Sequence, residues 1–413
     1  MPRFSRRLVL LLLVPIAIIG LAIATTSYIF PKPGVSPTPV VVAADSMGIA
    51  EKDGFTLSLD SLTSSGHIEY FQYLPSVTGH RKLSFLNPDI DAIYIYDLDS
   101  FHLEKLIRLT DYNFSHRRKI QGYYFINSDS LLVYSYADSR LTMLSLKKGI
   151  LLTRTIADPL ADPFTLVYPY VSGRTPIIMD SARNTVYFTG FSSDEGGTRE
   201  EDKHRNVVAS CNLSTGAVEY LCPYPEFYWG KNWGGAGGFR QSYMTFDPKR
   251  NRLVVSFMAD HRLYSSDVVH TRFIPFYGGS RYFTDIHSMK YSPNVFDFLP
   301  NPSIYRYYLE NPSYTLVKFD PYHDLYFRIA ELPFTKGDPK GMYDKTGEIL
   351  RKRKSMILLD TQLRKTGETP LSRGLDLEAL FLTEEGVYIR DRSVKSDDQL
   401  VFKLITFQKK KSL

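Results

Sequence analysis

Cysteine and tryptophan are scarce in this sequence, which has only two of each among its 413 residues. Two cysteines cannot build a disulfide framework or a cysteine-rich zinc module, so both classes are excluded. An excess of one charge is lacking as well, because 50 Lys and Arg oppose 44 Asp and Glu, a net charge of +6. Nucleic-acid-binding proteins concentrate more basic charge on one face, so nucleic acid is not expected as a partner.

Motifs that would assign chemistry directly are also missing. The sequence contains no G-x-S-x-G, no H-E-x-x-H and no Cys/His cluster with metal-ligand spacing. It therefore predicts no catalytic residue, no metal site and no cofactor.

Long apolar runs are missing except at the N-terminus. Met1–Arg7 carries three Arg, and the following Leu8–Ala24 has no charged residue. This run is short for a membrane-spanning helix and long for a signal peptide, and Ala22-Ile23-Ala24 fits a signal-peptidase site. Residues 1–30 are therefore expected to be either a retained membrane anchor or a cleaved signal, and both alternatives stay open.

The charge ahead of this run predicts where the rest of the chain lies. Positive residues before a first apolar segment stay in the cytoplasm, so the body is expected outside it, in the periplasm or at the cell surface. Residues 31–53 are expected to form a linker, because Pro31–Pro39 is a Pro-rich, semi-rigid stretch. Residues 54–413 then form the folded domain.

Aromatic residues and turn formers are abundant, with 29 Tyr, 26 Phe, 26 Gly and 24 Pro, which favours many short strands. A strand, a polar turn and a second strand recur six times, most clearly at Tyr243–Phe257 and Pro176–Gly190. The other copies are Glu69–Leu86, Gly122–Tyr136, Leu316–Ala330 and Ala379–Asp391. All but the last are followed by a second strand pair.

The repeat predicts an all-β fold, a six-bladed β-propeller of four-stranded antiparallel blades. A single blade cannot bury both faces, so the blades must stack around an axis. The last copy is followed by one strand only, Gln399–Gln408. Phe55–Leu62 alternates with period two and is expected to supply the missing N-terminal strand, which closes the ring and removes an unpaired edge. Two unrelated β domains are the alternative.

Loop lengths predict which face of the propeller works. Connections between strands 1 and 2 and between strands 3 and 4 are mostly tight, as at Ser181–Asn184. Almost every long insertion falls on the other face, between strands 2 and 3 or between blades: Asp158–Thr175, Phe191–Arg205, Glu226–Gln241, Gly278–Ser313 and Glu331–Arg353. Long loops are usually functional or disordered. We expect a binding face there, which we name the long-loop face; simple tolerance of insertion is the alternative.

Two of these insertions supply the expected ligand contacts. Phe227–Gln241 holds both tryptophans, whose rings can stack on a sugar or an apolar group, although a structural plug over the channel explains the segment as well. Gly278–Ser313 adds cations that suit oxyanions, while a hydrogen-bonded loop histidine is the plainer interpretation of its His. The expected contacts are Trp229, Trp233, Arg240, Arg281, His287 and Arg306.

Cys211 and Cys222 lie on the two strands of one predicted hairpin. Outside the cytoplasm they could form a disulfide, although cross-strand geometry is demanding, so a bond and two free thiols both stay open.

Ser192–Thr198 matches the core of the Asp-box of sialidase propellers. It occurs once and between strands 2 and 3, so we interpret it as a polar loop.

Several phrases resemble, in order, a family of uncharacterised six-bladed propellers of the bacterial envelope: Arg81–Asp97, Ile120–Asp129, Lys318–Ile329, Ile357–Glu368 and Phe381–Ile389. The family is a domain of unknown function with a TolB-like propeller, and its members are usually lipoproteins. The resemblance covers roughly Leu57 to Phe407 and implies the fold and an envelope location, but no activity. This sequence lacks the lipidated Cys, so the resemblance does not assign a lipid anchor.

Together these features predict a membrane-tethered or exported recognition module of the cell envelope. Its expected ligand is a carbohydrate, a peptide or an envelope protein. The alternative function is a carbohydrate-active hydrolase or lyase, which needs two carboxylates, or a His and a carboxylate, at the channel mouth. Asp285 and His287 are the candidates for that pair.

Overall fold

The computed structural model describes residues 45–75, 80–114, 119–157, 165–191, 199–234, 238–267, 272–289, 302–335 and 351–410. The predicted anchor or signal at residues 1–30 lies outside these residues, as does Pro31–Pro39. Within the described part of the chain, no helix is both long and apolar enough to cross a bilayer.

Six antiparallel sheets form the six blades of a β-propeller, as predicted. The first three contain β2 (Glu69–Leu74), β3 (Lys82–Asn87), β4 (Ala92–Asp97) and β5 (Leu103–Arg108); β6 (Ile120–Phe125), β7 (Ser130–Ser135), β8 (Arg140–Ser145) and β9 (Gly149–Thr155); and β11 (Ile178–Asp180), β12 (Thr185–Phe191), β13 (Asn206–Asn212) and β14 (Val218–Pro223). A short β10 (Tyr168–Pro169) also pairs with β12 in the third blade.

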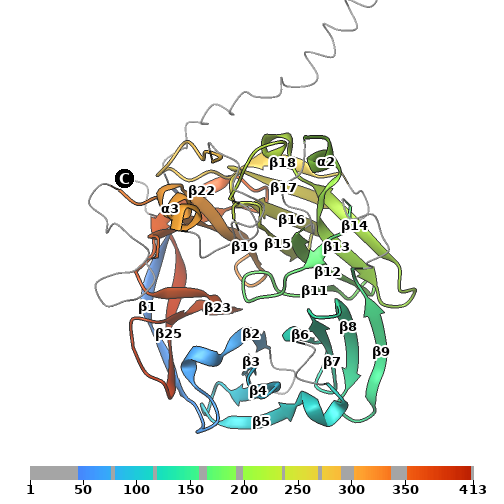
Figure 1. The fold of residues 1–413 in the computed structure, drawn as a ribbon. Helices are drawn as coiled ribbons and strands as arrows, with labels where there is room; N and C mark the ends of the chain where they lie inside the picture. The colour runs from blue at the N-terminus through green and yellow to red at the C-terminus, as the bar shows by residue number, and fades with distance from the viewer. Residues whose placement is uncertain are drawn as a thin grey trace, which may run out of the picture. The chain divides into compact units, whose positions relative to one another are not determined.

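The last three blades follow the same order. They contain β15 (Ser242–Asp247), β16 (Arg252–Phe257), β17 (Arg262–Asp267) and β18 (Ile274–Tyr277); β19 (Ser313–Asp320), β20 (Leu325–Glu331), β21 (Lys354–Leu359) and β22 (Lys365–Pro370); and β23 (Leu375–Thr383), β24 (Gly386–Asp391), β25 (Gln399–Lys409) and β1 (Met47–Ser58). Figure 1 shows β2, β6, β11, β15, β19 and β23 as the innermost strands around the centre.

Short helices lie in the connections between strands. They are the α-helices α2 (Arg199–His204) and α3 (Pro302–Glu310), and the 3₁₀ turns η1 (Ser65–His67), η2 (Leu109–Tyr112) and η4 (Glu226–Tyr228). The sequence patterns did not predict α2 or α3, which fall within two of the long insertions.

The ring closes through the N-terminal strand, which confirms that part of the prediction. β1 pairs antiparallel with β25 from Met47↔Lys409 to Ser58↔Gln399, with a bulge between Asp53 and Thr56. The strand begins earlier than the predicted Phe55–Leu62, so part of the expected linker belongs to the last blade. Figure 1 shows β1 and β25 side by side in this blade.

The tight turns form because Asp side chains cap them. The Asp180 carboxylate accepts hydrogen bonds from the backbone N–H groups of Ala182 and Arg183 at 3.1 and 3.3 Å, and Asn184 closes the turn with a φ of +51°. Asp and Asn favour such turns because their short side chains bond the local backbone and tolerate the left-handed region.

Neighbouring blades are joined by polar side chains as well as by the apolar core. Arg328 on β20 is fully buried, and its guanidinium lies 3.4 Å from the centre of the Tyr314 ring. It donates to Ser256 Oγ at 2.9 Å and to backbone carbonyls of the fourth blade at Phe257, Asp260, His261 and Gly278. Burial lowers the pKa of Arg328 to about 10, an effect that Tyr314 and Asp260 oppose.

Candidate functional site

Two adjoining cavities are the candidate site. The larger, of about 250 Å³, we name the basic cavity; its walls are Arg174, Tyr305, Tyr308, Glu331, Arg351, Lys352, Lys354, Leu375, Asp376, Leu377 and Glu378. The smaller, of about 170 Å³, we name the aromatic cavity; its walls are Arg174, Gly238, Phe239, Gln241, Tyr243, Met258, Ile304, Tyr305, Tyr307 and Tyr308. Arg174, Tyr305 and Tyr308 belong to both, so the two cavities share one wall.

Both cavities lie at the long-loop face. The basic cavity is built from the loop before β11, from α3, from the end of β20, from the loop into β21 and from the start of β23. The aromatic cavity adds the segment before β15, Tyr243 on β15 and the first residue after β16. These are connections between blades or between second and third strands, which leave the ring on the face predicted to bind.

Arg174 joins several blades around the shared wall. Its Nε donates to Glu378 on β23, and its backbone N–H reaches the other carboxylate oxygen of Glu378 at 3.2 Å. Its Nη1 donates to Thr315 Oγ1 on β19 at 2.6 Å, and the guanidinium lies 5.8 Å from the centre of the Tyr243 ring on β15. Arg174 is thereby held in one orientation by the fourth, fifth and sixth blades.

Lys352 fixes α3 over the basic cavity. Its buried Nζ donates to the Asn311 carbonyl at 2.8 Å and to Ser313 Oγ at 2.9 Å, and lies 3.6 Å from Glu331 Oε2. The ammonium also lies 3.8 Å from the centre of the Tyr308 ring, whose hydroxyl donates to Glu331. Burial lowers the pKa of Lys352 to about 8, although Glu331 opposes the shift.

The three expected contacts in Phe227–Gln241 have structural partners. Trp233 is 1% exposed and its Nε1 donates to the Tyr228 carbonyl at 3.3 Å; the half-buried Trp229 donates likewise to Tyr224 at 2.9 Å. The buried Arg240 makes two hydrogen bonds with Asp202, of 3.0 and 3.2 Å. None of the three belongs to the described walls of either cavity. These partners are all within the protein, and ligand contact by the three residues stays a prediction.

The expected contacts of Gly278–Ser313 are dispersed. Arg281 donates to the Glu368 carbonyl at 3.0 Å and pairs with Asp45, and Arg306 pairs along α3 with Glu310. His287 is exposed, and its carbonyl accepts the Tyr307 hydroxyl at 2.6 Å.

Asp285 is exposed too, and neither it nor His287 belongs to the described walls of the two cavities. The described part of the insertion instead contributes α3, whose Tyr305 lines both cavities.

The structure corrects the disulfide alternative. Cys211 and Cys222 are both free and buried. Cys211 is paired with Val218 near the turn of the β13–β14 hairpin, whereas Cys222 lies near its other end, beside the Asn206↔Pro223 pair. The two thiols are several residue pairs apart, so they cannot bond. The Asp-box-like Ser192–Thr198 lies outside the described residues.

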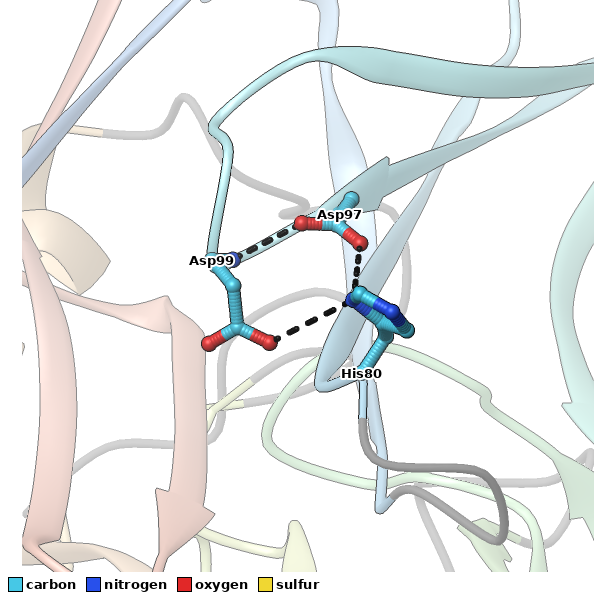
Figure 2. Close-up of side chains that lie close together, drawn as sticks. All are labelled: His80, Asp97 and Asp99. Atoms are coloured by element: carbon cyan, nitrogen blue, oxygen red, sulfur yellow. Dashed lines mark hydrogen bonds and ion pairs between the residues drawn. The ribbon is translucent and has the colours of Figure 1, made fainter.

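His80, Asp97 and Asp99 bring three metal-binding side chains together, as Figure 2 shows. His80 Nδ1 lies 3.3 Å from Asp97 and 3.9 Å from Asp99. However, Asp97 Oδ1 accepts the backbone N–H groups of Asp99 and Ser100 at 2.9 and 2.7 Å, and Asp99 Oδ1 accepts Arg81 Nε at 3.0 Å. The carboxylates cap the turn between β4 and β5, and we assign no metal to them.

The sequence profile of one family, a domain of unknown function designated DUF4221, matches residues 46–370. The chain belongs to the DUF4221 family. A solved Bacteroides vulgatus member has a TM-score of 0.71 and 19% identity, over 89% of this chain and all of that one. A candidate exported protein from Bacteroides fragilis has a TM-score of 0.47 and 11% identity, over 90% of this chain and 98% of its own. No curated protein matches the sequence. The structural likenesses show the fold alone.

The sequence analysis did not identify most of the residues that line the two cavities of this DUF4221 protein. Arg174, Glu331 and Glu378 are single charged residues in unrelated segments, and no local pattern marks them. One signal was present, because Arg351–Lys354 is a run of four basic residues that ends on the first residue of β21. A second was the spacing of Ile304, Tyr307 and Tyr308, which suits one face of a helix.

Proposed function

We propose that this DUF4221 propeller is a recognition module of the bacterial cell envelope that binds a small ligand in the paired cavities. The observation that carries the proposal is the meeting of both cavities at Arg174, Tyr305 and Tyr308 on the long-loop face. Ligand sites are concave and largely preformed, and combine apolar walls with a few fixed polar groups. The two cavities have this composition, and Arg174 is held by Glu378 and Thr315 before any ligand arrives.

The envelope location is supported by the sequence. Three Arg precede the apolar Leu8–Ala24, a pattern that exports or anchors the following chain. The proposal expects the protein in the envelope fraction of its native host. Recovery of the full-length protein in the cytosol alone would contradict the location without touching the binding site.

The binding proposal is tested by a thermal-shift screen of the full chain against small acids, sugars and short peptides. A ligand that binds only the folded state stabilises it by about 2.7 kcal/mol at a hundredfold excess over its Kd. Tyr305→Ala removes a shared wall, so we expect it to weaken any hit by about tenfold, which is 1.4 kcal/mol. Arg306→Ala is the matched control, because Arg306 is the next residue of α3 and lies outside the described walls. The proposal would be overturned if no compound shifts the melting temperature, or if the compounds that do so bind the Tyr305→Ala variant as tightly as the wild type.

A further inference from the structure

The charges of the basic cavity do not balance. Its described walls carry four cations, Arg174, Arg351, Lys352 and Lys354, against the carboxylates of Glu331, Asp376 and Glu378. Each carboxylate already has a cationic partner: Glu378 pairs with Arg174, Glu331 with Lys352, and Asp376 with Arg392 at 2.6 Å. Arg392 is itself a further cation beside the cavity.

Arg351 and Lys354 are therefore in excess. Within the described residues, neither side chain has an ion pair or a hydrogen bond. Arg351 is exposed, and Lys354 is half-buried. Burial lowers the pKa of Lys354, and Glu331 opposes the shift. A half-buried ammonium without a close anion costs free energy that an anionic ligand would recover.

A third cation nearby, Arg390, also lacks a partner for part of its charged group within the described part of the chain. Arg390 on β24 is 7% exposed, and its buried Nη1 has no hydrogen-bond partner among the described residues. Burial lowers its pKa, and the charges of Arg392 and Arg351 lower it further, while Asp376 opposes them. The end of the basic cavity near Asp376 is thus a region of positive potential.

The aromatic cavity is different, because three of the four tyrosine hydroxyl groups in its described walls are already hydrogen-bonded. Tyr308 donates to Glu331, Tyr307 donates to the His287 carbonyl at 2.6 Å, and Tyr243 shares a bond with Thr315 at 3.4 Å. The walls present ring surfaces, together with Phe239, Ile304 and Met258. A cavity of roughly 150 Å³ holds a benzene-sized group, so about 170 Å³ suits one ring.

We infer that the ligand is an aromatic carboxylate, with its ring in the aromatic cavity and its carboxylate beside Arg351 and Lys354. The inference rests on the proposed function and names the ligand class of that same site. The shared wall of Arg174, Tyr305 and Tyr308 lies between the two ends of such a molecule. A neutral sugar fits less well, because Gln241 and Arg174 are the only described side chains of the aromatic cavity with amide or guanidinium donors for its hydroxyl groups.

Isothermal titration of the full-length protein with three probes tests this inference. The probes are 3-phenylpropionate, its neutral amide, and propionate, which lacks the ring. We expect the acid to bind, and the amide and propionate each to bind at least about tenfold more weakly. The amide loses the charge that strengthens hydrogen bonds to the cations, and propionate loses the burial of the ring.

Variants then assign the acidic end. Arg351→Gln combined with Lys354→Met is expected to weaken the acid about tenfold or more and to leave the amide unchanged. Arg353→Gln is the matched control, because Arg353 is exposed, lies between the two and is outside the described cavity walls. Because Lys354 is half-buried, Arg351→Gln alone is measured too; it changes an exposed side chain and is expected to weaken the acid severalfold.

The outcomes separate the inference from the proposed function. If the amide binds as tightly as the acid and Tyr305→Ala weakens both, the site stands and the aromatic-carboxylate class is overturned. If Arg353→Gln weakens the acid as much as the double variant, the assigned cations are wrong. Failure of the acid to bind overturns the inference. The proposed function is overturned as well only if the screen is silent for every class or if its hits are unaffected by Tyr305→Ala.

Discussion

Arg328 gives the sharpest prediction about what holds the ring together. Its guanidinium makes five hydrogen bonds, all to neutral acceptors on the neighbouring blade, and stacks on Tyr314 at 3.4 Å. Arg328→Met keeps an unbranched chain and removes all of these interactions. At about 1 kcal/mol net for each hydrogen bond, the loss is about 5 kcal/mol.

Part of that loss is offset, because methionine removes a buried charge. The lowered pKa of Arg328, about 10, reflects the cost of desolvating the guanidinium. We therefore expect a net loss of about 3 kcal/mol, a large share of the 5–15 kcal/mol that stabilises an ordinary domain. Urea denaturation at pH 7, followed by tyrosine and tryptophan fluorescence, measures the free energy of unfolding.

Arg364→Met is the matched control for this measurement. Arg364 pairs with an acidic group, Asp360, at 2.7 Å, and its side chain is 73% exposed. Exposed ion pairs contribute about 0–1 kcal/mol, so this variant is expected to unfold almost as the wild type does. If Arg328→Met loses no more than Arg364→Met, the reasoning about the buried guanidinium is refuted.

Two further predictions concern the tryptophans and Lys318. Trp233→Ala should lose about 3–5 kcal/mol of unfolding free energy, and the half-buried Trp229→Ala less, in the same urea assay; equal losses would contradict the assigned burial. Lys318 on β19 is half-buried, and burial lowers its pKa to about 7 against the opposing charge of Glu378. The unfolded chain then binds more protons than the native one between about pH 7 and 10, so stability rises with pH in this window. Lys318→Met should flatten that rise, and parallel stability–pH curves for the two proteins would rule the shift out.

The blades were predictable because their information is local. Tyr243–Phe257 alternates on both sides of a polar turn, and it forms β15 and β16 with Asp247 and Asn251 at the turn. The closing strand was predictable for a different reason, since Gln399–Gln408 needs a partner that only an unassigned N-terminal strand supplies. The first residue of this strand was not predictable, because it depends on the register in which Met47 pairs with Lys409, at the other end of the chain.

The cavities were not predictable because their walls come from segments far apart in sequence. Arg174 meets Glu378 only because the third and sixth blades face one another across the ring. The burial of Trp233 was not predictable either. Trp233 packs against Phe227 and Tyr228, with ring centres 4.9 and 5.0 Å apart, whereas Trp229 is only half-buried.

The most direct test of the binding site is a crystal structure of the full chain, or of its family relative's equivalent region, grown with 3-phenylpropionate. The expected result is a ring in the aromatic cavity, against the side chains of Phe239 and Tyr308, and a carboxylate next to Lys354 and Arg351 in the basic cavity. A ligand bound at Trp229, at His80 or on the opposite face of the propeller, with both cavities empty, would contradict it.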